Sequence, residues 1–162
     1  MMRPGGFAPS AAWFALAAGV VALAGCASTP EASRERDAEA KRFVAQPGSA
    51  TIYVYRNDFS VGSQESTDTV LYLDDRLIGA TLPGTYFRID ARPGVYVLHG
   101  VGYDQGNLKL DARPEELQFV SLNVISGHSY FARARPEEAR QALRACCSLL
   151  ENWAPGQRPL LR

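Results

Sequence analysis

The feature that most constrains this chain is a series of short runs rich in β-branched and aromatic residues, separated by turn residues. Thr51–Arg56 (TIYVYR) has the strongest strand pattern. The other runs are Val70–Asp74, Thr85–Asp90, Val95–Val101, Leu108–Asp111, Leu117–Val124 and Ser129–Arg135. About seven short strands at this spacing predict a mainly β, antiparallel, sandwich-like domain rather than a parallel sheet. In the last run, strict alternation predicts that Tyr130, Ala132 and Ala134 face inward.

A single amphipathic helix is predicted after the strands, over Pro136–Trp153. Pro136 suits the first helical position, and the acidic residues that follow it suit the positive end of the helix dipole. One apolar stripe runs along this segment and consists of Ala139, Leu143, Cys146, Leu150 and Trp153. We therefore expect residues 49–162 to form one β-rich globular domain with a C-terminal α-helix packed on it.

The first 25 residues have the pattern of a secretory signal peptide. Arg3 is the only basic residue before a stretch, residues 5–25, that carries no charge. The apolar run from Ala11 is shorter than the roughly 20 residues that a membrane-spanning helix requires. We expect residues 1–25 to be removed.

This segment ends in Leu23-Ala24-Gly25-Cys26, which resembles the lipobox of bacterial lipoproteins at every position. The resemblance implies cleavage before Cys26 and lipidation of its thiol, with the membrane as partner through the lipid anchor. Two or more acyl chains hold a protein stably on a bilayer. Ala27 stands where lipoproteins retained at the inner membrane often have Asp, so the resemblance favours the outer membrane.

A highly charged stretch separates this cysteine from the predicted strands. Eight of the twelve residues in Glu31–Arg42 are charged, four of each sign, and no apolar face is evident. Gln46-Pro47-Gly48-Ser49 marks a boundary. We expect residues 26–48, which begin with the lipidated cysteine, to form a charged flexible tether with a reach on the order of 70 Å.

Val70–Asp104 resembles the PEGA-type β repeat, with a hairpin in which Asp75 replaces the usual Gly, followed by Arg92-Pro93-Gly94 before a strand. More broadly, Thr51–Arg135 resembles a family of Gram-negative lipoproteins of unknown function. The resemblance implies a small sandwich-like domain on the cell envelope and no assigned chemistry.

Composition leaves little material for catalysis. The 17 basic and 17 acidic residues balance, which argues against a nucleic-acid partner. His99 and His128 are the two histidines, expected to be partly buried and exposed, respectively. Adjacent Asp74 and Asp75 would point to opposite faces of a strand. We expect no cofactor, no metal site and no catalytic residue.

Two further features leave alternatives open. Cys146 and Cys147 are adjacent, and a disulfide between them within a helix would be strained, so two buried free thiols or a redox or metal pair are the alternatives. The tyrosines on the predicted strands either are half-buried or form an exposed platform: Tyr53, Tyr55, Tyr72, Tyr86, Tyr96 and Tyr103.

Taken together, these features predict a lipid-anchored envelope protein that acts as a non-catalytic binding or structural module. Its partner would be an envelope protein, a glycan or peptidoglycan. The alternative is an envelope hydrolase that uses His99 or His128, with Ser126 and Ser129 near the latter. The loop over residues 57–69 is long enough to be functional.

Overall fold

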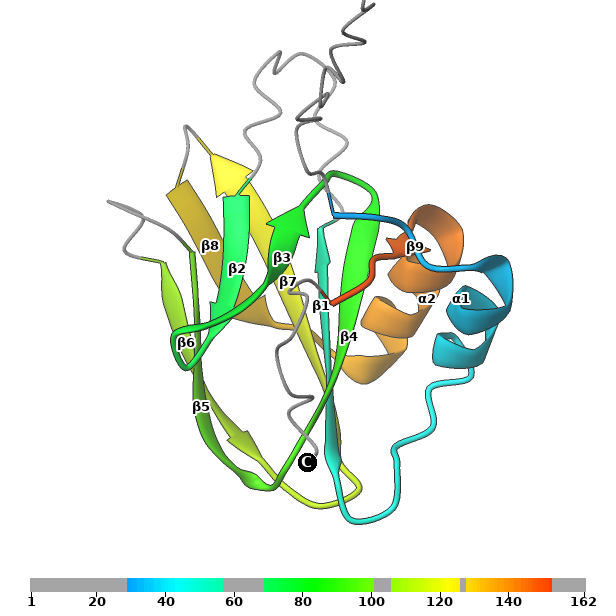
Figure 1. Ribbon diagram of the computed structural model, residues 1–162, viewed down its shortest axis with the longest axis horizontal. Coiled ribbons are helices and arrows are strands. Elements are labelled where there is room, and N and C mark those ends of the chain that lie inside the picture. The colour runs from blue at the N-terminus through cyan, green and yellow to red at the C-terminus, as the bar shows by residue number, and fades with distance from the viewer. Residues whose placement is uncertain (1–28, 57–68, 101–105, 126–127, 153–162) are drawn as a thin grey trace, which may run out of the picture.

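A computed structural model describes residues 29–56, 69–100, 106–125 and 128–152 (Figure 1). Within these ranges the chain forms two helices, α1 (Arg34–Ala40) and α2 (Pro136–Cys146). The strands are β1 (Ala50–Arg56), β2 (Thr69–Leu73), β3 (Arg76–Thr81), β4 (Thr85–Ala91), β5 (Gly94–His99), β6 (Asn107–Ala112), β7 (Leu117–Ile125), β8 (His128–Arg133) and β9 (Ser148–Leu149).

The strands form two sheets that pack face to face, and both helices cover the outer face of one of them (Figure 1). The five-stranded sheet has the order β8-β7-β1-β4-β9, and the four-stranded sheet has the order β3-β2-β5-β6. The predicted mainly β, sandwich-like domain with a helix packed on it is therefore confirmed.

Strand β1 shows how the layers are built, because it is buried at all seven positions. Ile52 and Val54 belong to the core between the two sheets. Tyr53 and Tyr55 belong to a second core, between the five-stranded sheet and the helices. Alternate side chains of one strand thus serve two cores.

The pairing is not wholly antiparallel. The four-stranded sheet is antiparallel throughout, but β1 pairs with β7 in parallel, and β4 pairs with β9 in parallel. Sequence patterns predict strands but not their partners, because partners are chosen by packing between distant segments.

Two strands were not predicted, β3 and β9. β3 contains Gly79, which weakens a strand pattern, but a Cβ at this position would lie 2.8 Å from the Phe87 ring. Glycine is therefore required here by close packing of the strand on a core side chain.

The alternation predicted for β8 is wrong by one residue. Ser129 is buried and Phe131 packs on the inter-sheet core, whereas Tyr130 is 53% exposed. Because side chains alternate along a strand, a shift of one residue exchanges the two faces.

Helix α2 begins at Pro136 as predicted, but it ends at Cys146 rather than at Trp153. Ala139 and Leu143 pack toward the sheet, as the apolar stripe predicts. Beyond the helix, Ser148 N donates to Gly84 O at 3.0 Å and Leu150 N donates to Tyr86 O at 2.8 Å. Residues 148–150 therefore pair with the edge of β4, although Leu150 also fits the apolar stripe of a longer helix.

The structure also differs from the flexible tether expected up to residue 48. Over residues 29–48 the chain is folded onto the domain, and Ser33 caps the N-terminus of α1, because its Oγ accepts a hydrogen bond from Arg36 N. Ala40 and Phe43 are buried in the second core. The sequence did not reveal this contact, because two apolar residues in a seven-residue helix and the turn after it are too few to form a periodic apolar pattern among the charged residues.

The Asp37 carboxylate fixes α1 to the sheet. Its Oδ1 accepts hydrogen bonds from Tyr86 Oη at 2.9 Å and from Leu149 N at 3.0 Å, and its Oδ2 accepts one from Lys41 Nζ at 2.7 Å. One charged side chain therefore joins α1, β4 and β9.

We predict that Asp37→Ala lowers the free energy of unfolding by about 2 kcal/mol, because it leaves Leu149 N without its acceptor and leaves Tyr86 Oη only the longer contact with Asp37 O. Urea denaturation measures this change. Glu39→Ala, which removes an exposed carboxylate from the same helix, is the matched control and should change stability little. Equal effects of the two substitutions would contradict the role of Asp37.

A second prediction concerns alkaline pH. Burial raises the pKa of Tyr53 to about 12, and burial, with the hydrogen bond to Asp37, raises the pKa of Tyr86. Unfolded tyrosines ionise near pH 10, so this stabilisation is complete below about pH 10 and is lost as the pH rises toward about 12.

Denaturation midpoints measured between pH 8 and pH 12, with phenolate absorbance, check this expectation. In Tyr86→Phe the dependence of stability on pH above about 10 should become shallower. An unchanged dependence would show that Tyr86 ionises equally easily in the folded and unfolded states.

Candidate functional site

Some of the residues singled out by the sequence lie outside the described part of the chain. These are Cys26, Tyr103, Ser126 and Trp153, together with the loop residues 57–68. The rest of the predicted signal segment, Ala27, Val101 and Asp104 also lie outside the described part.

His99 lies at the end of β5, on the outer face of the four-stranded sheet. Its ring stacks on Tyr72, with ring centroids 5.2 Å apart and planes 5° apart. Nδ1 lies 2.9 Å from Gly100 O, and Nε2 lies 3.4 Å from Asp75 Oδ1. The expected half-buried, hydrogen-bonded histidine is confirmed, although on an outer face.

The contacts of His99 orient its ring. A carbonyl oxygen only accepts, so the contact with Gly100 O requires a proton on Nδ1. Nε2 faces the exposed Asp75 carboxylate, and this contact is an ion pair only when the imidazole carries both protons. Both ring nitrogens thus lie next to oxygen atoms of the protein.

Asp74 and Asp75 do not lie on opposite faces of a strand, because both occupy the turn between β2 and β3. Their φ values are +47° and +58°, as a tight hairpin turn requires. Asp74 Oδ1 accepts a hydrogen bond from Val97 N at 2.7 Å, whereas the Asp75 side chain is fully exposed. One carboxylate is structural, and the other lies beside His99.

Sequence reasoning missed the pairing of Asp75 with His99. The strand register brings the two residues together, because Tyr72 pairs with His99 across β2 and β5, and the hairpin turn that contains Asp75 follows directly after β2. Register between strands distant in sequence is a property of the folded sheet.

His128 is exposed, as expected, but it is the first residue of β8 rather than part of a turn. Its neighbour Ser129 is 1% exposed, and the Ser129 Oγ lies 3.2 Å from Thr69 Oγ1. The His128 side chain faces solvent and the Ser129 side chain faces the core, so these two residues do not form a nucleophile and base together.

In the described ranges, no group of three or more His, Cys, Asp or Glu side chains is arranged to hold a metal ion. The helices of the same ranges are all too short or too polar to cross a membrane.

The described tyrosines of the prediction have three different surroundings. Tyr96 is partly buried and packs on the core between the sheets. Tyr53, Tyr55 and Tyr86 are buried beneath the helices. On the outer face of the four-stranded sheet, Tyr72 is partly exposed beside Val97 and Val95, which are 37% and 56% exposed. An exposed surface containing tyrosine therefore exists, but it is smaller than the expected platform.

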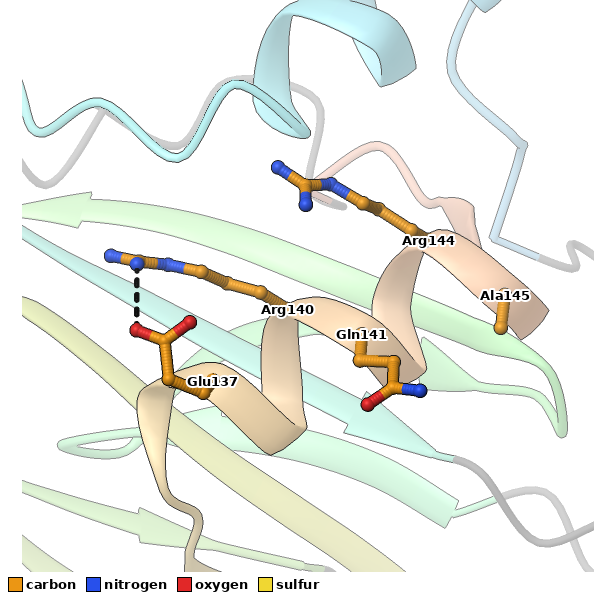
Figure 2. Close-up of a pocket in the computed structure, with 5 residues that line it drawn as sticks. All are labelled: Glu137, Arg140, Gln141, Arg144 and Ala145. Atoms are coloured by element: carbon orange, nitrogen blue, oxygen red, sulfur yellow. Dashed lines mark hydrogen bonds and ion pairs between the residues drawn. The ribbon is translucent and has the colours of Figure 1, made fainter.

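Helix α2 carries a shallow open pocket on its outer side, shown in Figure 2. Arg140 and Arg144 extend to the same side of α2, and Arg140 Nη1 lies 3.3 Å from Glu137 Oε1. The Arg144 guanidinium carbon lies 5.1 Å from the centre of the Phe43 ring. These cations cover the aromatic core and are held by it, through cation–π contacts.

Cys146 and Cys147 form a disulfide, so the expectation of free thiols is wrong. That expectation assumed two helical residues. In the structure Cys146 ends α2, whereas Cys147 is extended, with φ −121° and ψ 139°. The bond therefore lies at the junction between helix and strand, where Cys147 is 4% exposed.

We predict that Cys26→Ser protein, isolated from an oxidising compartment without reductant, has no thiol that reacts with iodoacetamide after denaturation. Reduction should make both Cys146 and Cys147 reactive, as measured by the mass added per chain. Cys147→Ser introduced into this protein is the control, because it frees Cys146. Two alkylated thiols before reduction would contradict the pairing.

Comparison with known proteins gives one similarity that bears on this chain. It is 27% identical over 128 residues to an uncharacterized protein of Haemophilus influenzae, and the match covers 75% of this chain and 74% of that protein. No family model matches the chain, and no solved structure matches it.

Proposed function

We propose that this protein is a lipoprotein of the bacterial cell envelope, anchored through an acylated Cys26, whose β-rich domain is a non-catalytic binding or structural module. The observation that carries the proposal is Leu23-Ala24-Gly25-Cys26 at the end of a charge-free apolar segment. Ala27 favours the outer membrane as its location.

The outer face of the four-stranded sheet is the proposed contact surface. Val95 and Val97 are exposed aliphatic residues, next to the stacked Tyr72 and His99. Valine side chains offer no hydrogen-bonding group to sugar hydroxyls, whereas they suit the apolar centre of a protein interface. We therefore favour an envelope protein as partner over a glycan or peptidoglycan.

A hydrolase is the other candidate, and Asp75 beside His99 is the observation in its favour. General base catalysis needs an unprotonated ring nitrogen within reach of the attacking group. Nδ1 of His99 faces Gly100 O and Nε2 faces Asp75, so neither of these contacts brings a nucleophilic side chain to the ring. The binding module is therefore the better supported function.

The anchor predicts that Cys26→Ser abolishes metabolic labelling by a fatty acid and moves the protein from the membrane fraction to the soluble fraction. Two acyl chains account for essentially all stable membrane association of such a protein. The double variant Cys146→Ser, Cys147→Ser is the control, and it should remain labelled and membrane-bound. Unchanged labelling and fractionation of Cys26→Ser would refute the lipoprotein assignment.

The contact surface is tested by placing a photo-crosslinking amino acid at Val97 in living cells. We expect a discrete adduct with an envelope protein, identified by mass spectrometry, because this position is exposed on the proposed face. The same amino acid at Glu39, exposed on α1, is the control. Equal adducts at both positions, none at Val97, or a cell-wall fragment in place of a protein would contradict this partner.

A further inference from the structure

Residues 29–32 are part of the folded domain. Thr29 is 3% exposed, and its Oγ1 accepts a hydrogen bond from Ala80 N at 2.8 Å. Glu151 N donates to Pro30 O at 2.9 Å, and Ala32 N donates to Leu149 O at 2.8 Å. Three hydrogen bonds, to β3 and to the segment that contains β9, therefore fix the position at which the chain enters the domain.

This entry point lies very close to Cys26 along the chain. Two residues, Ala27 and Ser28, lie between Cys26 and Thr29, so three Cα-to-Cα steps join them, and an extended chain spans at most about 3.6 Å per step. The distance from Cys26 to the buried Thr29 is therefore at most about 11 Å. A tether with a reach on the order of 70 Å requires the whole of residues 27–48 to be free, and residues 29–48 are not.

We propose that the lipid anchor holds the domain directly against the bilayer, with the end of the sandwich that carries Thr29 turned toward the lipid headgroups. This inference rests on the proposed lipidation of Cys26. The partner of this end of the domain is the headgroup layer of the leaflet that holds the acyl chains.

The turn between β3 and β4 belongs to this membrane-facing end. It follows Ala80, the residue that binds Thr29, and Figure 1 shows it beside the start of the blue segment. The turn residues Leu82-Pro83-Gly84 and the flanking Thr81 and Thr85 carry no charge, so their contact with headgroups requires no desolvation of an ionised side chain.

The turn between β4 and β5 lies at the opposite end of the sandwich (Figure 1). It contains the exposed, charged Arg92. The strand between these two turns has seven residues, which corresponds to about 23 Å. The proposed orientation therefore places Leu82 near the headgroups and Arg92 well above them.

The test uses full-length lipidated protein, purified from membranes and reconstituted into vesicles of phosphatidylethanolamine and phosphatidylglycerol. A fluorescent amino acid replaces either Leu82 or Arg92, and some lipids carry a short-range quencher on the headgroup. We expect the probe at position 82 to be quenched about threefold more than the probe at position 92, because about 23 Å separates them. Equal quenching, or stronger quenching at position 92, would overturn the orientation.

A matched control lengthens the link. Twelve Gly and Ser residues inserted between Ser28 and Thr29 preserve the lipobox and Ala27, and they add a flexible span of about 20 Å. We expect the difference in quenching between the two positions to disappear. A difference that persists would overturn the role of the short link.

The mass of the N-terminal peptide separates this inference from the proposed function. An acylated Cys26 with equal quenching at both positions overturns the orientation and leaves the lipoprotein assignment intact. An unmodified Cys26 in membrane-derived protein overturns the lipoprotein assignment, and the orientation with it.

Discussion

The hydrogen bonds of the Asp37 carboxylate hold helix α1 on the five-stranded sheet. They join α1 to the hydroxyl of Tyr86 on β4 and to the backbone of Leu149 on β9. Arg36, on the same helix, also pairs with Glu151 beyond β9. Because β9 is only two residues long, it depends on these contacts and on the edge of β4 for its place.

The helical layer in turn decides which residues the five-stranded sheet can carry. Phe43 packs edge to face on Tyr53 and Phe119, and Tyr53 Oη donates to Ala40 O at 2.7 Å. Without the helices these aromatic rings would face water, and the sheet would have one wet face. With the helices in place the sheet is covered on both faces, which is why β1 is buried at every position.

The segment that contains α1 also connects the domain to the proposed anchor. A charged stretch that behaved as a spacer would let the domain rotate freely above the bilayer. A stretch folded against β4 and β9 leaves a short link, so the orientation of the domain becomes a property of its fold. The outer face of the four-stranded sheet, with Tyr72 and Val97, lies on the opposite side of the sandwich from the helices (Figure 1).

The sequence by itself determined the β-rich class, the position of β1 and the start of α2 at Pro136, because local alternation and capping express these features within a few residues. It also carries the Cys26 motif, which is a prediction still to be tested. Only the tertiary structure decided that residues 29–48 belong to the domain, that β9 replaces the end of the expected helix, that Cys146 pairs with Cys147, and that Asp75 lies beside His99. The physical reason is common to all four: each depends on a neighbour brought close by the fold, and no local pattern of residues encodes that neighbour.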